Sequence, residues 1–195
     1  MKPNIGQGDK GKTHLPGGKE ENDKVWKDSP QVEAYGELDE LNSLVGFLHA
    51  QEKILPDDAN TLREIQDYIF RAELHVSAQG TKLEDSTVPV FGKGAVDALE
   101  KKIEKLEKNL SEIKHFILPG GTQEAALADM VRTKSRSVER RVVAWIKTVE
   151  KPTPTQEAVL AYVNRLSDYF FALSRILNQR AGKTPPPWKG REKTK

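Results

Sequence analysis

The chain has 195 residues, which is enough to bury the core of one domain. A net charge of only +2 argues against a dedicated nucleic-acid binder, and the absence of cysteine excludes disulfides, thiolate metal sites and a cysteine nucleophile. No apolar run is long enough to span a membrane, and the first residues lack a signal-peptide apolar region. We therefore expect a cytoplasmic protein.

Residues 1–28 are rich in glycine and lysine, and residues 6–13 fit the phosphate-binding pattern G-x-x-x-x-G-K-[ST]. That motif works between a buried strand and a helix. Here Pro16 and two glycines follow it, so a P-loop NTPase is not expected. Two interpretations stay open. The segment is either a glycine loop that wraps phosphates with its backbone N–H groups and lysines, or a basic tail.

Apolar residues at helical spacing predict five helices joined by short connections, with no convincing strand. The predicted helices run from the Ser29-Pro30 cap to about Ala50, from Pro56 to about Gln79, from about Gly94 to Leu110, from Thr122 to before Pro152, and from about Thr155 to Ala181. This pattern predicts an all-α, antiparallel five-helix bundle over residues 29–181. Residues 182–195 are rich in proline and lysine and are predicted to be a disordered basic tail.

The first helix is predicted to bury one stripe and to carry a polar face beside it. The buried stripe is Val32, Tyr35, Leu38, Leu41, Val45 and Leu48. Asp39 lies on the polar face, although aspartate is a poor residue for a helix interior. It is therefore either exposed to solvent or retained to form an ion pair.

The fourth helix carries a second polar face, because four charged residues recur at steps of three, four and three. These residues are Asp129, Arg132, Arg136 and Glu139, with Arg140 and Arg141 beside them. A solvated face laced with ion pairs is the plain interpretation. The alternative is a binding surface, because the planar fork of arginine suits phosphates and carboxylates.

A helical bundle also suggests a di-iron site, which needs two Glu-x-x-His motifs and two further carboxylates. The sequence has one such motif, Glu112 to His115, and it lies at a helix end rather than in the middle of a bundle. A di-iron protein is therefore not expected, and no hydrolase nucleophile elbow is present either.

Taken together, several stretches are specific to one family. They are GDKGKT (8–13), VEAYGELDELNSLVGF (32–47), FILPGGTQEAA (116–126), RTKSRSVERRVV (132–143) and NRLSDYFFALSR (164–175). In these stretches the chain resembles the PduO-type ATP:cob(I)alamin adenosyltransferases, also called corrinoid adenosyltransferases. The resemblance implies a ferritin-like five-helix bundle that assembles as a homotrimer with active sites between subunits.

The resemblance also implies the reaction. Cob(I)alamin attacks the 5′ carbon of ATP, adenosylcobalamin forms, and triphosphate leaves with Mg²⁺. Because Co(I) is itself a strong nucleophile, the protein has to orient ATP, stabilise the leaving group and make Co(II) reducible. A reductase and an adenosylcobalamin-dependent enzyme are the implied partners.

By similarity, the implied catalytic residues are Asp39 and Arg132, which form a salt bridge on the corrin side, and Phe116. The Phe116 ring lies under the corrin and displaces the lower axial ligand of cobalt. Asn164 is implied to contact ATP or its Mg²⁺. The residues implied to bind ATP are Gly8, Asp9, Lys10, Gly11, Thr13, Lys27, Arg136, Glu139, Arg140 and Asn164.

The sequence departs from the family pattern at three positions. Ile5 stands where threonine is common, and Ser137 stands where a second arginine is usual. Asp129 lies in a stretch where the family commonly has Leu-His, and it can compete with Asp39 for Arg132. These departures keep two other interpretations open: a relative that binds or escorts a corrinoid without adenosylating it, and a purely structural bundle.

Overall fold

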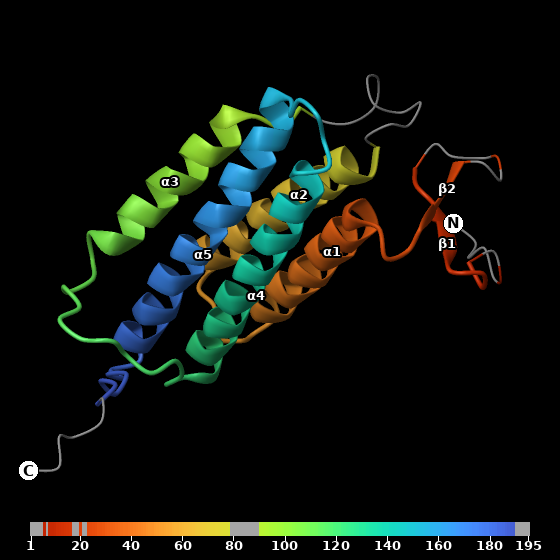
Figure 1. Ribbon diagram of the computed structural model, residues 1–195. Coiled ribbons are helices and arrows are strands. Elements are labelled where there is room, and N and C mark those ends of the chain that lie inside the picture. Colours follow the sequence, from red (N-terminus) through yellow and green to blue (C-terminus); the bar gives the residue numbers. More distant parts are fainter. Residues whose placement is uncertain (1–5, 7, 17–19, 21–22, 79–89, 190–195) are drawn as a thin grey trace, which may run out of the picture.

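A computed structural model of the chain describes residues 6, 8–16, 20, 23–78 and 90–189. The helices are α1 (Pro30–His49), α2 (Pro56–Ala78), α3 (Lys93–Glu107), α4 (Gln123–Ile146) and α5 (Pro154–Arg180). They lie side by side, and α4 runs antiparallel to both α1 and α5 (Figure 1). The predicted all-α five-helix bundle is confirmed, and each helix lies close to its predicted bounds. None of the helices in the described part of the chain is long and apolar enough to cross a lipid bilayer.

Three helices begin at hydroxyl side chains that cap the first turn. Ser29 Oγ accepts a hydrogen bond from Val32 N, and Thr122 Oγ1 accepts one from Ala125 N at 3.1 Å. Thr153 and Gln156 form a reciprocal capping box at the start of α5. Each cap satisfies a backbone N–H that has no partner within the helix, so the sequence fixes where these helices start.

The core lies where the apolar stripes of the helices converge, with Trp145, Tyr162 and Phe170 completely enclosed. Two residues of the predicted α1 stripe are not buried, because Val32 is only half-buried and Tyr35 is exposed. Tyr35 is 37% exposed, and Ala34 is fully buried in its place. The buried stripe of α1 starts at Ala34 and continues by steps of four and three to Leu48. Tyr35 is one position further along the chain, which turns its ring about 100° away from that stripe.

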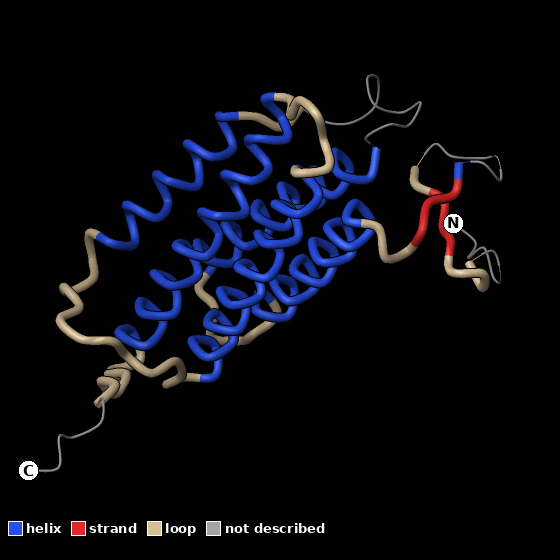
Figure 2. Tube along the Cα trace, viewed as in Figure 1, coloured by secondary structure: helices blue, strands red, loops and turns tan. Residues whose placement is uncertain are grey.

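A small antiparallel hairpin precedes the bundle, formed by β1 (Lys12–His14) and β2 (Lys24–Trp26). It lies beyond the start of α1 (Figure 2). No strand was predicted here, because three residues are too few to show an alternating pattern. Lys12 Nζ lies 4.9 Å from the centroid of the Trp26 ring, a cation–π contact that joins the two strands.

The described part of the tail pairs with the segment that precedes α4. Trp188 N donates to Phe116 O at 2.7 Å, and Leu118 N donates to Pro186 O at 3.0 Å. This corrects the expectation of disorder as far as residue 189, whereas residues 190–195 lie outside the described residues. The consecutive prolines hold the tail extended, and an extended chain can exchange main-chain hydrogen bonds with another extended segment.

Candidate functional site

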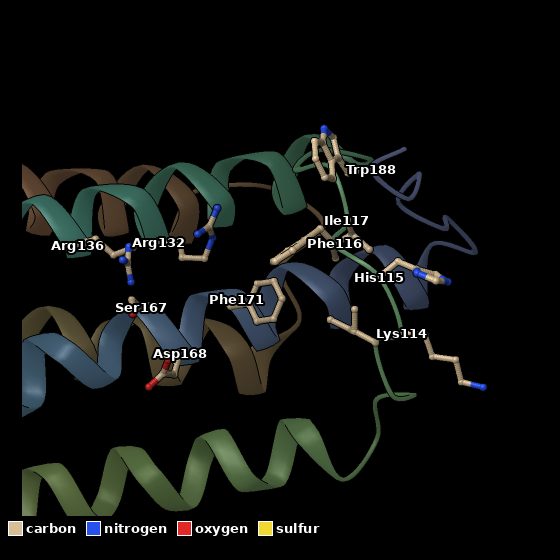
Figure 3. Close-up of a pocket in the computed structure, with 11 residues that line it drawn as sticks. Lys114, His115, Phe116, Ile117, Arg132, Arg136, Ser167, Asp168, Phe171 and Trp188 are labelled. Carbon is tan, nitrogen blue, oxygen red and sulfur yellow. The ribbon is translucent and has the colours of Figure 1, made fainter. Parts of the chain in front are cut away.

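An open cleft of about 910 Å³ lies between α4, α5 and the segment that precedes α4 (Figure 3). Three residues predicted from the sequence line this cleft: Phe116, Arg132 and Arg136. Phe171 of α5 and Trp188 of the tail complete its aromatic wall. An aromatic wall beside two arginines suits a large, flat ligand that carries polar groups at its edge.

Phe116 is not an ordinary core residue. Its ring is 80% exposed and makes an edge-to-face contact with Trp188, with the ring centroids 6.4 Å apart. Its carbonyl oxygen accepts the Trp188 N–H, so the backbone beneath the ring is fixed by the tail. The structure thus presents an anchored aromatic side chain to the cleft.

Arg132 does not pair with Asp39 within the chain. Its Nε donates to Asp129 Oδ1 at 3.3 Å, and its guanidinium carbon lies 6.0 Å from the centroid of the Phe171 ring. Asp129 is one helical turn from Arg132, so this pair forms without any tertiary rearrangement. Asp39 is exposed on α1, and within the single chain Arg132 pairs with Asp129 instead, so the Asp39–Arg132 salt bridge stays a prediction for the assembled protein.

The Gly120-Gly121 turn before α4 is held by two buried side chains. Both glycines have positive φ, at 127° and 107°, which favours glycine. Asp129 Oδ2 accepts from Gly120 N at 3.1 Å, while Asn178 Nδ2 donates to Gly120 O at 2.7 Å. A Cβ added at Gly121 would lie 2.0 Å from Asn178 Oδ1, so no larger residue fits. The turn therefore anchors the end of the segment that carries Phe116.

Glu139 of α4 and Asn164 of α5, which are both predicted to bind ATP, face each other. Asn164 Nδ2 donates to Glu139 Oε1 at 2.9 Å. Arg165 NH1 donates to Asn164 Oδ1 at 2.6 Å, and Arg165 Nε donates to Glu100 Oε1 of α3 at 2.8 Å. We name this chain of hydrogen bonds, from Glu100 to Glu139, the polar relay. It sets the direction in which the Asn164 amide points.

Sequence reasoning missed Arg165 and Glu100. Arg165 lies inside the stretch NRLSDYFF and next to Asn164, so its place in the motif was the available signal. Glu100 is one charged residue among many on α3, and only the packing of α3 on α5 brings it to Arg165.

Arg136 and Arg140 are exposed on the same side of α4. Arg136 lines the cleft and points toward Ser167 of α5 (Figure 3). Arg140 NH1 donates to the carbonyl oxygen of Arg136 at 3.0 Å. Among the described residues no ion pair involves either guanidinium, so both have donors left for an anionic ligand.

The predicted phosphate loop is part of the hairpin region. Gly11 has φ of 76°, and its carbonyl oxygen accepts from Lys27 N at 3.0 Å. A Cβ added at Gly8 would lie 2.8 Å from Lys27 Nζ, so the ammonium rests against Gly8. Asp9 and Lys10 are exposed, and Thr13 pairs with Val25 in the hairpin. We call residues 8–13 together with Lys27 the N-terminal loop; Ile5 lies outside the described residues.

The hairpin region with the N-terminal loop lies beyond the start of α1, at the end of the bundle away from the start of α4 (Figure 1). The cleft is lined by residues 113–117, which precede α4, and by residues of α4 and α5. Within one chain, the residues predicted to bind ATP therefore form two separate groups.

Asp39 and Glu73 interact between α1 and α2, together with Tyr35 and Asn42, and we call these four residues the acidic cluster. Glu73 is 4% exposed, and burial, together with the charge of Asp39, raises its pKa to about 7, while a hydrogen bond with Asn42 opposes the rise. Burial and the Asp39 charge also raise the pKa of Tyr35. A cation placed beside this cluster would be stabilised. Nothing in the sequence pattern pointed to Glu73.

The described residues hold no group of three or more His, Asp or Glu side chains placed to bind a metal ion. Asn164 is the predicted Mg²⁺ contact, and its Oδ1 already accepts from Arg165. An amide oxygen has two lone pairs, so one remains for a hard cation that keeps most of its ligands as water and phosphate oxygen. The residue therefore fits a magnesium ion brought in by a nucleotide.

Comparison with known proteins gives one consistent result. The family model described as cobalamin adenosyltransferase matches residues 4–177. A corrinoid adenosyltransferase of Bacillus subtilis is 40% identical over 178 residues, which cover 90% of this chain and 86% of the relative. A cobalamin adenosyltransferase of Cupriavidus metallidurans is 33% identical over 93% of this chain and 90% of its own length.

Solved structures agree with this result. A variant of the PduO-type ATP:corrinoid adenosyltransferase of Lactobacillus reuteri, complexed with cobalamin and ATP, superposes with a TM-score of 0.83. It is 32% identical to this chain, and the match covers 94% of this chain and 97% of that one. The similarity predicted from the five sequence stretches is thus confirmed, and the chain belongs to the cobalamin adenosyltransferase family.

Proposed function

We propose that this protein transfers the 5′-deoxyadenosyl group of ATP to cob(I)alamin. The observation that carries the proposal is the cleft, in which the exposed Phe116 ring faces a space lined by Arg132 and Arg136. Glu139 and Asn164 of the polar relay lie on the same two helices, α4 and α5. A similar protein has been solved with both cobalamin and ATP, which supports the same pair of substrates here.

The reaction forms a bond between cobalt and C5′ of ATP and breaks the C5′–O bond. Triphosphate leaves with the electron pair of that bond. Because the substrate supplies the nucleophile, the chain needs no activated serine or general base. Its task is to align C5′ with cobalt and to neutralise the negative charge that develops on triphosphate. Arg136 and Arg140 supply donors for this purpose on α4, and Lys27 supplies an ammonium in the N-terminal loop.

Phe116 acts on the other substrate. Its ring lies beneath the corrin and excludes the lower axial ligand, because an apolar ring offers cobalt no donor atom. Four-coordinate Co(II) is more easily reduced, and one electron from a reductase converts it to Co(I). The backbone anchors at Phe116 and Gly120 keep the ring in place.

The active protein is a homotrimer in which each site lies between two subunits. The separation of the N-terminal loop from the cleft supports this assembly, because a loop from one subunit can complete the cleft of the next. The acidic cluster of Tyr35, Asp39, Asn42 and Glu73 supports it as well. Asp39 of one subunit then pairs with Arg132 of its neighbour, and this cation offsets the repulsion between Asp39 and the buried Glu73.

Magnesium binds with ATP, and Asn164 provides one oxygen ligand or contacts the nucleotide directly. The ion supplies charge neutralisation on the phosphates. The protein works in the cytoplasm and delivers its product to an adenosylcobalamin-dependent enzyme.

One observation favours a second candidate function. Asp129 already occupies the Nε of Arg132, which is the competition expected of a relative that binds corrinoid without adenosylating it. The test is an anaerobic assay in which chemically reduced cobalamin is mixed with MgATP and the protein. Saturable, ATP-dependent loss of the Co(I) absorbance with adenosylcobalamin as product supports the enzyme. Corrinoid binding by folded protein without product supports the escort.

A further inference from the structure

Asp129 holds two different donors on its two carboxylate oxygens. Oδ2 accepts from Gly120 N at 3.1 Å, and Oδ1 accepts from Arg132 Nε at 3.3 Å. The residue is only 8% exposed. Hydrogen bonds to a charged group are stronger than neutral ones, and removal from water strengthens them further. Aspartate is unfavourable in a helix interior, but here both carboxylate oxygens of Asp129 accept hydrogen bonds.

The Gly120 end of this bridge leads to Phe116. Gly120 is also held through its carbonyl oxygen by Asn178, while Trp188 holds the carbonyl oxygen of Phe116. The short backbone from Phe116 to Gly120 is therefore fixed at both ends. Any shift of the Asp129 carboxylate moves one of these two anchors.

The Arg132 end of the bridge leads into the cleft. With Nε committed to Asp129 and the guanidinium near the Phe171 ring, the plane of the fork has one preferred direction. The terminal nitrogens stay available, because arginine has five N–H donors and Asp129 takes one of them. Asp129 thus helps to fix the positions of both Phe116 and the Arg132 guanidinium in the same cleft.

We infer that Asp129 is a positioning residue, which fixes the Arg132 guanidinium relative to the segment that carries Phe116. This inference rests on the proposed function, since it concerns alignment of the corrinoid. A competing role makes the opposite prediction: if Asp129 merely withheld Arg132 from its partner, its removal would raise turnover.

The test is Asp129→Asn, since the amide replaces one of the two carboxylate oxygens by an NH2 group, which faces one of the two donors with a donor. We expect kcat/KM for cob(I)alamin to fall about 10-fold, as for loss of a hydrogen bond to a charged group, while KM for ATP stays unchanged. The matched control is Asp97→Asn, which makes the same change in the same-helix Lys93–Asp97 ion pair of α3. That variant should keep native kinetics.

Coupling separates positioning from a purely structural role. Lysine lacks the Nε–H that Asp129 accepts from. In an Arg132→Lys background, Asp129→Asn should therefore lower kcat/KM for cob(I)alamin by less than about a further twofold. Losses that multiply in the double variant would overturn the inference, as would unchanged or faster turnover of Asp129→Asn. If Asp129→Asn lowers the melting temperature of the protein, the same loss of kcat/KM should be measured at a temperature at which both the variant and the native chain are folded. Absence of turnover in the native chain would defeat the proposed function, and this inference with it.

Discussion

In the cleft, contacts with other residues hold Phe116 and Arg132, whereas the described contacts of the N-terminal loop are almost all made within the hairpin region. Arg132 contacts Asp129 and Phe171, and Phe116 contacts Trp188 through its carbonyl oxygen and its ring. The loop is closed by Lys27 N on Gly11 O and by the strand pairing next to it. The difference indicates that one chain forms the walls of the cleft by itself, whereas the N-terminal loop needs a second surface to pack against.

The largest expected effect comes from a residue that lines the cleft. Arg136→Ala should lower kcat about 100-fold, because a preorganised donor to developing negative charge is lost. Steady-state kinetics with cob(I)alamin and ATP measure it. Arg141→Ala is the matched control, because Arg141 is an arginine of the same helix that pairs with Glu33 at 3.6 Å outside the cleft. Equal losses in both variants would show that general charge, and not the cleft, matters.

Phe116→Ala tests the aromatic wall. We expect turnover that starts from cob(II)alamin to fall about 10-fold, while KM for ATP changes little, because the ring acts on cobalt and not on the nucleotide. The absorption spectrum of bound cob(II)alamin should show the lower ligand retained. Phe70→Ala removes a similarly exposed ring on α2 and serves as the control. An unchanged rate with unchanged cobalt spectra would contradict the role of Phe116.

Glu73 gives a pH-dependent prediction. Its pKa of about 7 lies above the ordinary value of 4.5, so folding is penalised once the carboxylate ionises. The contribution of Glu73 to the free energy of unfolding is therefore fully present below about pH 4.5. It is lost as pH rises through 7, by up to about 3 kcal/mol. Urea unfolding at fixed protein concentration should show this fall between pH of about 5 and 8. The slope should vanish in Glu73→Gln, and a slope retained in that variant would assign it elsewhere.

The smallest expected effect is at the outer end of the polar relay. Glu100→Gln keeps an acceptor for Arg165 but removes its charge. We expect KM for ATP to rise about threefold with kcat unchanged, since half-exposed ion pairs contribute little. Glu104→Gln on the same helix should leave KM unchanged, and a kcat effect from Glu100→Gln would show that the relay does more than orient Asn164.

The bundle was predictable because its helices carry their own starts and stripes, as the Thr122 cap and the buried run from Ala34 to Leu48 show. The family resemblance implied Phe116 and Arg132 on the corrin side and Arg136 at the nucleotide, and the structure brings all three to one cleft. Spacing could not reveal contacts that depend on tertiary packing. Glu100 meets Arg165 only because α3 packs on α5, and the tail reaches Phe116 from far along the chain. Within one chain Arg132 pairs with Asp129, and whether Asp39 meets Arg132 depends on assembly, which helical spacing does not give.

The central claim is that the N-terminal loop of one subunit completes the cleft of another. The most direct test mixes Lys27→Ala, which damages the loop, with Arg136→Ala, which damages the cleft, after joint unfolding and refolding. If sites lie between subunits, random mixing regenerates intact sites, and about a quarter of native activity returns. If each chain builds its own site, the mixture stays as inactive as the two variants alone, and the claim is contradicted.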